Sequence, residues 1–187
     1  MMELPKPGEI RTVINKYGKH VFFQDFIRPD GTTSDFLLFE GTTTPAIIFP
    51  VTKDGKVIAL KQFRFGANEI VLEVPGGNPE LHDNLQETIT RELMEETGYA
   101  PERVTRLADK LYFEPAMVRT SYIPVLAMDC ELRQKPHPSR SEFFEVALFS
   151  FDEWIKKIMK GEVADSKSIA MTLMALPHLG YKIDKVK

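Results

Sequence analysis

The sequence has very little cysteine and no long apolar segment. Cys130 is the only cysteine among 187 residues, and only four histidines are present. An intramolecular disulfide is therefore excluded, and no zinc-finger spacing occurs. No apolar run approaches the ~20 residues that a membrane helix needs, and the amino terminus lacks the basic-then-apolar order of a signal peptide. We expect a soluble, cytoplasmic protein that has no membrane partner.

An excess of positive charge is also missing. Lysine and arginine total 24 against 27 aspartate and glutamate residues, which gives a net charge of −3. Such a chain has no overall basic field with which to hold nucleic-acid phosphates, so we expect no nucleic-acid partner. Its apolar content of 43% is enough for a real core, and its length fits one ordinary domain with a small appendage.

Most of the chain has the pattern of β-strands. An amino-terminal hairpin is expected from strands 21–27 and 35–39, joined by the turn sequence Arg28-Pro29-Asp30-Gly31. An isolated two-stranded sheet is only marginally stable in water, so this hairpin must dock on its own domain or on a second subunit. Further strands are expected at 46–51, 57–62, 69–74, near 111, and at 120–128 and 144–150.

Three helices are expected, and their order with the strands indicates the fold class. A helix at 84–97 would begin with a capping box of Asp83 and Gln86 and end at Gly98. The others are expected at 152–160, with Ser150 and Glu153 as the capping box, and at 166–176. Strands followed by a helix, more strands and closing helices predict an α/β or α+β domain with a mixed sheet between helices.

The helix at 84–97 carries carboxylates on the face that should meet the core. At about 100° per residue, Glu92 and Glu96 fall in the apolar sector that contains Ile89, and Glu95 lies at its edge. A solvated helix would place them on the opposite side, and an incompletely solvated carboxylate without a partner costs roughly several kcal/mol. Arg91 alone cannot neutralise three acids. The pattern therefore predicts a bound cation.

The ligand types indicate which cation this is. Carboxylate oxygens without histidine or cysteine favour Mg²⁺ or Mn²⁺, which usually retain waters and bind substrate phosphates as further ligands. Directly upstream, Pro75-Gly76-Gly77 lets the backbone approach a ligand closely, and a free carbonyl there could join the metal site. Together these features indicate phosphate chemistry.

Read together, these residues resemble a known family signature. Gly77, then five residues to Asp83, then seven to the sequence Arg91-Glu92-Leu93-Met94-Glu95-Glu96-Thr97-Gly98-Tyr99, is similar to the Nudix box, Gly-x5-Glu-x7-Arg-Glu-U-x-Glu-Glu-x-Gly-U, where U is a bulky aliphatic residue. The spacing agrees at every fixed position. Two residue types differ: Asp83 stands for the first glutamate and Tyr99 for the last aliphatic residue. Asp83 either supports Arg91, as the family's glutamate does, or caps the helix.

The resemblance implies a fold and a set of metal ligands. The Nudix fold is a mixed β-sheet sandwiched between α-helices, in which the box forms a loop, a helix and a loop that bind divalent metal and a diphosphate. Carried over, Glu92 and Glu96 are metal ligands, Glu95 is a ligand or a close and catalytically important neighbour, and the Gly76 carbonyl is a further ligand. Arg91 would orient the glutamates.

Features outside the box are similar to the ADP-ribose and nucleoside-diphosphate-sugar pyrophosphatase branch. They include Gln62-Phe63-Arg64, Leu72-Glu73-Val74-Pro75-Gly76-Gly77, a proline sixteen residues after the box at Pro115, the acidic loop 139–146 and the closing helix 161–170. By this resemblance Arg64, Glu73 and Pro115 serve substrate binding. Glu142 would be the general base or a ligand of the metal-bound water, reaching the site from its loop.

The branch implies a reaction and a subunit arrangement. Water would attack one phosphorus of a small-molecule nucleotide sugar with two to three Mg²⁺ or Mn²⁺ ions per site. ADP-ribose would give AMP and ribose 5-phosphate; GDP-mannose would give a nucleoside monophosphate and a sugar 1-phosphate. Residues 1–43 would be a hairpin extension exchanged between two subunits of a homodimer, and 44–187 the Nudix domain. The aromatics Phe22, Phe23, Phe26 and Phe36 could stack on a base, although core or interface packing is the commoner role.

Two other kinds of function remain open. One is another Nudix pyrophosphatase, acting on nucleoside triphosphates, dinucleoside polyphosphates, coenzyme A or capped RNA. The other is a non-catalytic module that binds a nucleotide sugar and reports it to a partner. All three box glutamates are present, which favours an enzyme.

Overall fold

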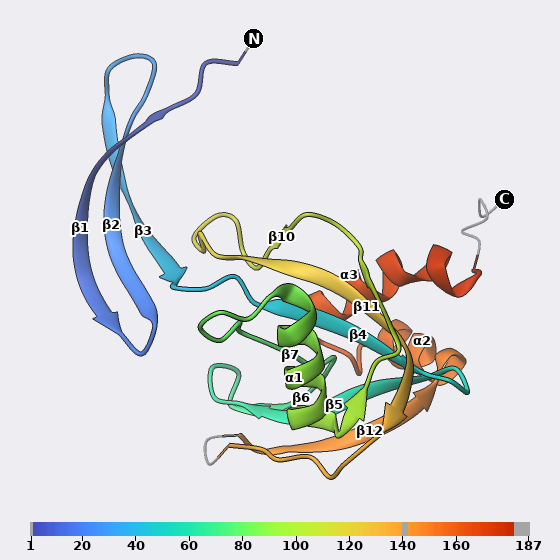
Figure 1. Cartoon of the computed structure of the whole chain (residues 1–187). Helices are drawn as coiled ribbons and strands as arrows, with labels where there is room; N and C mark the ends of the chain where they lie inside the picture. Colours follow the sequence, from blue (N-terminus) through green and yellow to red (C-terminus); the bar gives the residue numbers. More distant parts are fainter. Residues whose placement is uncertain (1, 140–141, 182–187) are drawn as a thin grey trace, which may run out of the picture. The chain divides into compact units, whose positions relative to one another are not determined.

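The computed structural model describes residues 2–139 and 142–181 (Figure 1). Two compact units are distinguished by their internal contacts: unit 1 contains Met1–Thr44 and Leu111–Tyr122, and unit 2 contains Pro45–Lys110 and Ile123–Lys187. The predicted boundary between residues 43 and 44 stays a prediction; the contacts also group residues 111–122 with the first unit. None of the helices in the described part of the chain combines the length and apolar character needed to cross a bilayer.

Unit 1 is built on a three-stranded antiparallel sheet. Its strands are β1 (Lys6–Lys16), β2 (Lys19–Ile27) and β3 (Thr33–Gly41), in the order β1-β2-β3. The predicted hairpin is confirmed as β2 and β3, with Gly31 in the turn at a positive φ of 83°. Strand β1 was not predicted, because Pro7 and Gly8 interrupt its pattern and its pairing with β2 contains two register shifts.

The segment 111–122 is bound to this sheet by several hydrogen bonds, among which those of Arg119 reach the core. The backbone N–H of Arg119 donates to the carbonyl of Phe39 at 2.8 Å, and its guanidinium lies 4.8 Å from the centre of the Phe22 ring. The same guanidinium donates to the side-chain oxygen of Gln24. Because Phe22 and Gln24 are both buried, Arg119 connects the segment to the core of unit 1.

Unit 2 contains a mixed sheet, as predicted. The central order is β11-β4-β5-β12, in which β11 and β4 are parallel and the other neighbours are antiparallel. Short strands extend it: β6 pairs with β5, β7 with β4, and β8 and β9 with β11. The bounds are β4 Ala46–Thr52, β5 Lys56–Arg64, β6 Glu69–Glu73, β7 Gly76–Gly77, β8 Tyr99–Ala100, β9 Arg103–Arg106, β11 Ser121–Leu132 and β12 Phe144–Ser150. The first two residues of β11 belong to unit 1, where they pair with β10 (Leu111–Tyr112).

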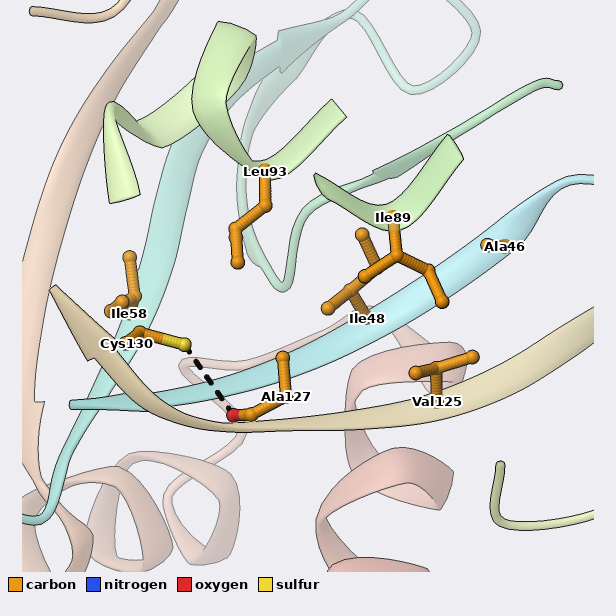
Figure 2. Packing of buried hydrophobic residues seen from close by; sticks show 8 residues of the cluster. All are labelled: Ala46, Ile48, Ile58, Ile89, Leu93, Val125, Ala127 and Cys130. Carbon is orange, nitrogen blue, oxygen red and sulfur yellow. Dashed lines mark hydrogen bonds between the residues drawn. The ribbon is translucent and has the colours of Figure 1, made fainter. Parts of the chain in front are cut away.

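Helices cover both faces of this sheet. Helix α1 (Leu85–Thr97) contributes Ile89 and Leu93 to a buried cluster with Ile48 of β4, shown in Figure 2. The next strand residue, Phe49, points to the opposite face and packs against Trp154, with ring centres 6.5 Å apart. Trp154 belongs to α2 (Phe151–Met159) and donates to Thr172 of α3 (Ser166–Ala175). The predicted sandwich is therefore confirmed.

The single cysteine is part of this core. Cys130 packs in the cluster of Figure 2, and its thiol donates to the carbonyl of Ala127 at 3.5 Å. Burial raises the pKa of the thiol to about 12, so it stays protonated and unreactive at neutral pH. Cys130 is a packing residue.

The start of α1 differs from the prediction by one residue. The N-cap is Asn84, which accepts from the backbone N–H of Glu87 at 3.0 Å, and the Glu87 carboxylate accepts from the Asn84 N–H at 2.8 Å. The expected box of Asp83 and Gln86 is wrong, because Asp83 is drawn to Arg91 instead. The predicted capping box of α2, Ser150 with Glu153, is confirmed.

The position of this cap can be tested by stability. Asn84→Ala should lower the free energy of unfolding by about 1 kcal/mol, since it removes the acceptor for a helix-end N–H. Gln86→Ala is the matched control and should change it by less than about 0.5 kcal/mol, as usual for exposed sites. Urea denaturation measures both. Equal losses would show that α1 is capped differently in solution.

Candidate active site

Two glycines bring the backbone against the box helix. Strand β7 consists of Gly76 and Gly77, which pair with Ile47 and Ala46 of β4. A Cβ at Gly76 would lie 2.5 Å from the backbone oxygen of Ala46, and a Cβ at Gly77 would overlap the carboxylate of Glu92. The absence of a side chain at Gly76 therefore lets β7 lie close against β4, and its absence at Gly77 leaves the space that the Glu92 carboxylate occupies.

Glu96 is the most deeply buried of the box glutamates. It is only 7% exposed, and one carboxylate oxygen accepts from the backbone N–H of Gly76 at 2.9 Å. Burial raises its pKa to about 8; the Gly76 hydrogen bond opposes this, and the charges of Glu92 and Glu142 add to it. The predicted inward direction of this side chain is confirmed.

Glu92 and Glu95 differ in their exposure. The Glu92 side chain is 14% exposed, and burial, with repulsion from Glu95 and Glu142, raises its pKa although Arg91 opposes the shift. The Glu95 side chain is 48% exposed and lies 3.3 Å from Arg91. The sequence placed Glu92 and Glu96 inside the apolar sector and Glu95 at its edge, and the observed burial follows that order.

Arg91 joins the loop between β7 and α1 to the helix. Its guanidinium donates to Asp83 at 3.1 and 3.2 Å and to the carbonyl oxygen of Asn78 at 2.8 Å. It also contacts Glu92 at 3.0 Å. Of the two readings left open for Asp83, contact with Arg91 is the one the structure shows. Because its donors are shared among several acceptors, Arg91 compensates the buried carboxylates only in part.

Glu142 lies within electrostatic range of the box glutamates. Its charge raises the pKa of both Glu92 and Glu96. Its carboxylate accepts from the backbone N–H of Ser139 at 2.8 Å, which closes a local turn. Residues 140–141 of the predicted acidic loop lie outside the described residues. The structure thus brings Glu142 into the neighbourhood of Glu92 and Glu96.

Arg64 and Glu73 form a salt bridge beside the site. The Nε of Arg64 donates to the Glu73 carboxylate at 2.5 Å, and the positive charge of Arg64 also lowers the pKa of Glu96. Glu73 is 1% exposed. Burial raises its pKa, although Arg64 and Lys167 act in the opposite direction. The Glu73 carboxylate therefore faces these two cations and not solvent.

The amino terminus of α3 reaches the same place, which the sequence did not reveal. Lys167 pairs with Asp165 and lies 3.9 Å from the Glu73 carboxylate. Asp165 caps α3 by accepting from the N–H and hydroxyl of Ser168, whose oxygen accepts from the backbone N–H of Val74 at 2.9 Å. The Asp-x-x-Ser spacing signals the cap, but its contact with residue 74 depends on the fold.

Pro115 lies in unit 1, where it lines a cavity of about 510 Å³. Two of the four aromatics considered from the sequence, Phe26 and Phe36, line it too, with their rings edge to face at 5.7 Å. Phe22 is instead fully buried. The remaining lining residues are Pro5, Arg28, Ser34, Leu38, Tyr112, Ala116, Met117, Val118 and Arg119.

The donor set fits a divalent cation. The charge of Glu142 raises the pKa of Glu92 and of Glu96 in a partly dry site, and Arg91 shares its donors between Glu92 and other acceptors. Within residues 2–139 and 142–181, no three acidic, histidine or cysteine side chains are already gathered as a cluster that could hold a metal. An ion held by three of these carboxylates would therefore require side chains to move together when it binds, and hard oxygen ligands suit Mg²⁺ or Mn²⁺.

Comparison with known proteins identifies the class. The model of the NUDIX domain matches residues 42–170. An ADP-ribose pyrophosphatase from Bacillus subtilis is 29% identical over 87% of this chain and 85% of its own length. A GDP-mannose pyrophosphatase from Yersinia enterocolitica is 28% identical over 88% of this chain and 90% of its own length. A crystal structure of an ADP compounds hydrolase superposes with a TM-score of 0.83 at 16% identity over 96% of both chains, which shows the shared fold.

This chain belongs to the Nudix family, and the resemblance inferred from the box is confirmed. Within that family it is a Nudix pyrophosphohydrolase, similar to ADP-ribose and GDP-mannose pyrophosphatases. The roles of the individual residues Arg64, Glu73, Gly76, Glu92, Glu95, Glu96, Pro115, Arg91 and Glu142 stay predictions.

Proposed function

We propose that this protein hydrolyses the pyrophosphate bond of a nucleoside diphosphate sugar, ADP-ribose or a similar compound such as GDP-mannose, in a reaction that depends on Mg²⁺ or Mn²⁺. The observation that carries the proposal is the burial of Glu96 and Glu92 against a glycine pair, with too little positive charge nearby to balance them. The similarity to pyrophosphatases of both kinds supports the substrate class.

The reaction assigns a task to each polar group. Bound divalent ions, two or three in number, would polarise the phosphoryl oxygens and lower the pKa of the attacking water. Glu92, Glu96 and the Gly76 carbonyl would hold them, with Glu95 as a ligand or close neighbour. Arg91 keeps Glu92 and Glu95 oriented through its contacts at 3.0 and 3.3 Å.

The proton of the attacking water needs an acceptor near the carboxylate pair. Glu142 is the candidate general base, because its charge already acts on Glu92 and Glu96 and its carboxylate accepts a local hydrogen bond from the backbone N–H of Ser139. Release of that contact would free the side chain to approach water at the site.

The diphosphate and the nucleoside need separate binding groups. The planar guanidinium of Arg64 suits phosphate oxygens, and only its Nε is used in the salt bridge with Glu73. Within unit 1, Phe26 and Phe36 form aromatic walls of the cavity that Pro115 also lines, and such rings can stack on a base.

We also propose that the protein is a homodimer in which residues 1–43 contact a second subunit. The three-stranded sheet of unit 1 exposes several large apolar side chains, namely Ile10, Val13, Ile14, Phe23, Leu37 and Phe39. Of these, Phe23 and Leu37 lie opposite one another in the β2–β3 register, and exposed apolar patches are typical of protein interfaces.

A turnover panel tests the function. ADP-ribose, GDP-mannose, UDP-glucose, NADH and 8-oxo-dGTP are incubated with the protein and Mg²⁺, and products are resolved by chromatography. We expect ADP-ribose or GDP-mannose to be the best substrate, with AMP and ribose 5-phosphate, or GMP and mannose 1-phosphate, as products, and no turnover in EDTA. Preference for 8-oxo-dGTP would indicate a different Nudix substrate class. Binding without hydrolysis throughout would identify a non-catalytic module.

A further inference from the structure

We propose that Glu73 is a positioning residue, which acts by holding Arg64 toward the diphosphate and does not itself contact substrate. The inference rests on the proposed function and deepens it. It assigns the helix α3 a part in diphosphate binding through residues that make no substrate contact of their own.

The salt bridge between Arg64 and Glu73 runs diagonally across the β5–β6 pair. In the β5–β6 register Arg64 lies opposite Glu69, whereas Glu73 lies opposite Leu60 at the far end of the pair. The Arg64 side chain therefore runs back along the hairpin to reach Glu73 at 2.5 Å. Exposed Glu69, although opposite in the register, is not its ion-pair partner in the described structure. This diagonal contact fixes where the guanidinium lies.

The two partners of this salt bridge differ in burial. Glu73 is almost completely inaccessible, whereas the Arg64 side chain is 48% exposed. The bond uses the Nε donor, and the two Nη groups retain their donors for a ligand. Because the buried Glu73 carboxylate already holds the half-exposed guanidinium in place, Arg64 would lose less side-chain entropy on binding a diphosphate.

Helix α3 fixes Glu73 in turn. Lys167 lies 3.9 Å from the Glu73 carboxylate and pairs with Asp165, so a second cation balances the buried charge. Ser168 accepts from the backbone N–H of Val74, the next residue in the chain. Both the side chain of residue 73 and the backbone of residue 74 are thus held from the same helix end.

A double-mutant cycle tests the proposal. The variants Glu73→Gln, Arg64→Ala and the combination are assayed for kcat and KM with ADP-ribose. Binding is measured by calorimetry in EDTA with a methylene-bridged ADP-ribose, in which carbon replaces the bridging pyrophosphate oxygen. Glu73→Gln should weaken analogue binding and raise KM by on the order of tenfold, the scale of one charge-assisted hydrogen bond, while kcat changes by less than about threefold. In the Arg64→Ala background it should have no further effect, since the two act as one unit.

The outcome that overturns the inference is additivity. If Glu73→Gln weakened the Arg64→Ala protein by the same factor as the wild type, Glu73 would contact substrate itself or act only through the fold. Glu69→Gln is the matched control, because it removes a neighbouring exposed carboxylate of the same hairpin, and both constants should stay at the wild-type values. Urea denaturation of all variants checks the fold.

A second variant covers the case in which Glu73→Gln does not fold. Arg64→Lys keeps the charge, but a compact ammonium cannot bridge Glu73 and a diphosphate as a planar fork does. It should lose analogue binding nearly as far as Arg64→Ala, and wild-type binding would refute the positioning role. If the wild-type protein bound the analogue without hydrolysing ADP-ribose, the proposed function would be refuted. The positioning role of Glu73 would still be tested, because the double-mutant cycle can be measured by binding.

Discussion

Replacing Glu96 with glutamine is expected to remove most turnover while leaving the fold intact. The change preserves the shape of the side chain and its acceptor for the Gly76 N–H, but it removes the charge that would hold a divalent ion. We expect kcat with ADP-ribose to fall by roughly a hundredfold or more, the scale for losing one electrostatic group in a water-poor site. Steady-state kinetics at saturating Mg²⁺ measure this. Near-normal activity would remove Glu96 from the metal site.

The same variant should be more stable than the wild type at high pH when metal is absent. Glu96 has a pKa of about 8 in the folded protein against the ordinary value of 4.5. Between these values the folded state keeps a proton that the unfolded state has released. The wild-type free energy of unfolding therefore decreases as the pH rises from about 4.5 to 8, at about 1.4 kcal/mol per unit as an upper limit.

Urea denaturation in EDTA at several pH values tests this sign. The stability advantage of Glu96→Gln should be absent near pH 4.5, grow through the neutral range and level off above pH 8. A difference that did not depend on pH would show that Glu96 is ionised, and balanced, in the metal-free protein.

Gly77→Ala should lower activity strongly with little loss of stability. The new Cβ would overlap the Glu92 carboxylate, which is the flexible end of a side chain and can move aside. A displacement of about 1 Å in a positioned group can cost about a hundredfold in rate. In the same preparation, kinetics should therefore show a reduced kcat, whereas urea denaturation should show a nearly unchanged free energy of unfolding.

Gly76→Ala is the matched comparison, and we expect it to lower the free energy of unfolding clearly, unlike Gly77→Ala. Its Cβ would lie 2.5 Å from the backbone oxygen of Ala46 and 3.0 Å from the Cα of Ile47. A backbone cannot move aside as a side chain can, so we expect a loss of about 1–3 kcal/mol, typical of overpacking. If Gly77→Ala proved equally destabilising, the Glu92 carboxylate would be fixed more firmly than this geometry indicates.

The burial of Glu92 and Glu96 could be predicted because it depends only on helix periodicity. Ile89 and Leu93 had to face the core, and the two glutamates share their sector of the helix. The choice between Asp83 and Asn84 as N-cap could not be made in the same way, since both residue types cap helices well. A contact eight residues away, between Asp83 and Arg91, decides it.

Short or irregular strands could not be predicted from the local sequence, because they too depend on contacts with other parts of the chain. Strand β7 is two glycines that become a strand only by pairing with β4, and β1 depends on β2. The contact of Ser168 with Val74 joins residues far apart in the chain. No periodicity encodes such a pairing, although the cap sequence that begins with Asp165 marks the helix end that makes it.

The hydrogen bond from Gly76 to Glu96 makes one backbone amide a natural reporter of the site. The proton that leaves Glu96 as the pH rises, and any ion that approaches the same carboxylate, both change the acceptor of this single N–H. The nitrogen and proton chemical shifts of Gly76 should consequently follow the charge state of the pocket. A spectroscopist could read the occupancy of the site from one resonance, without a substrate and without a mutation.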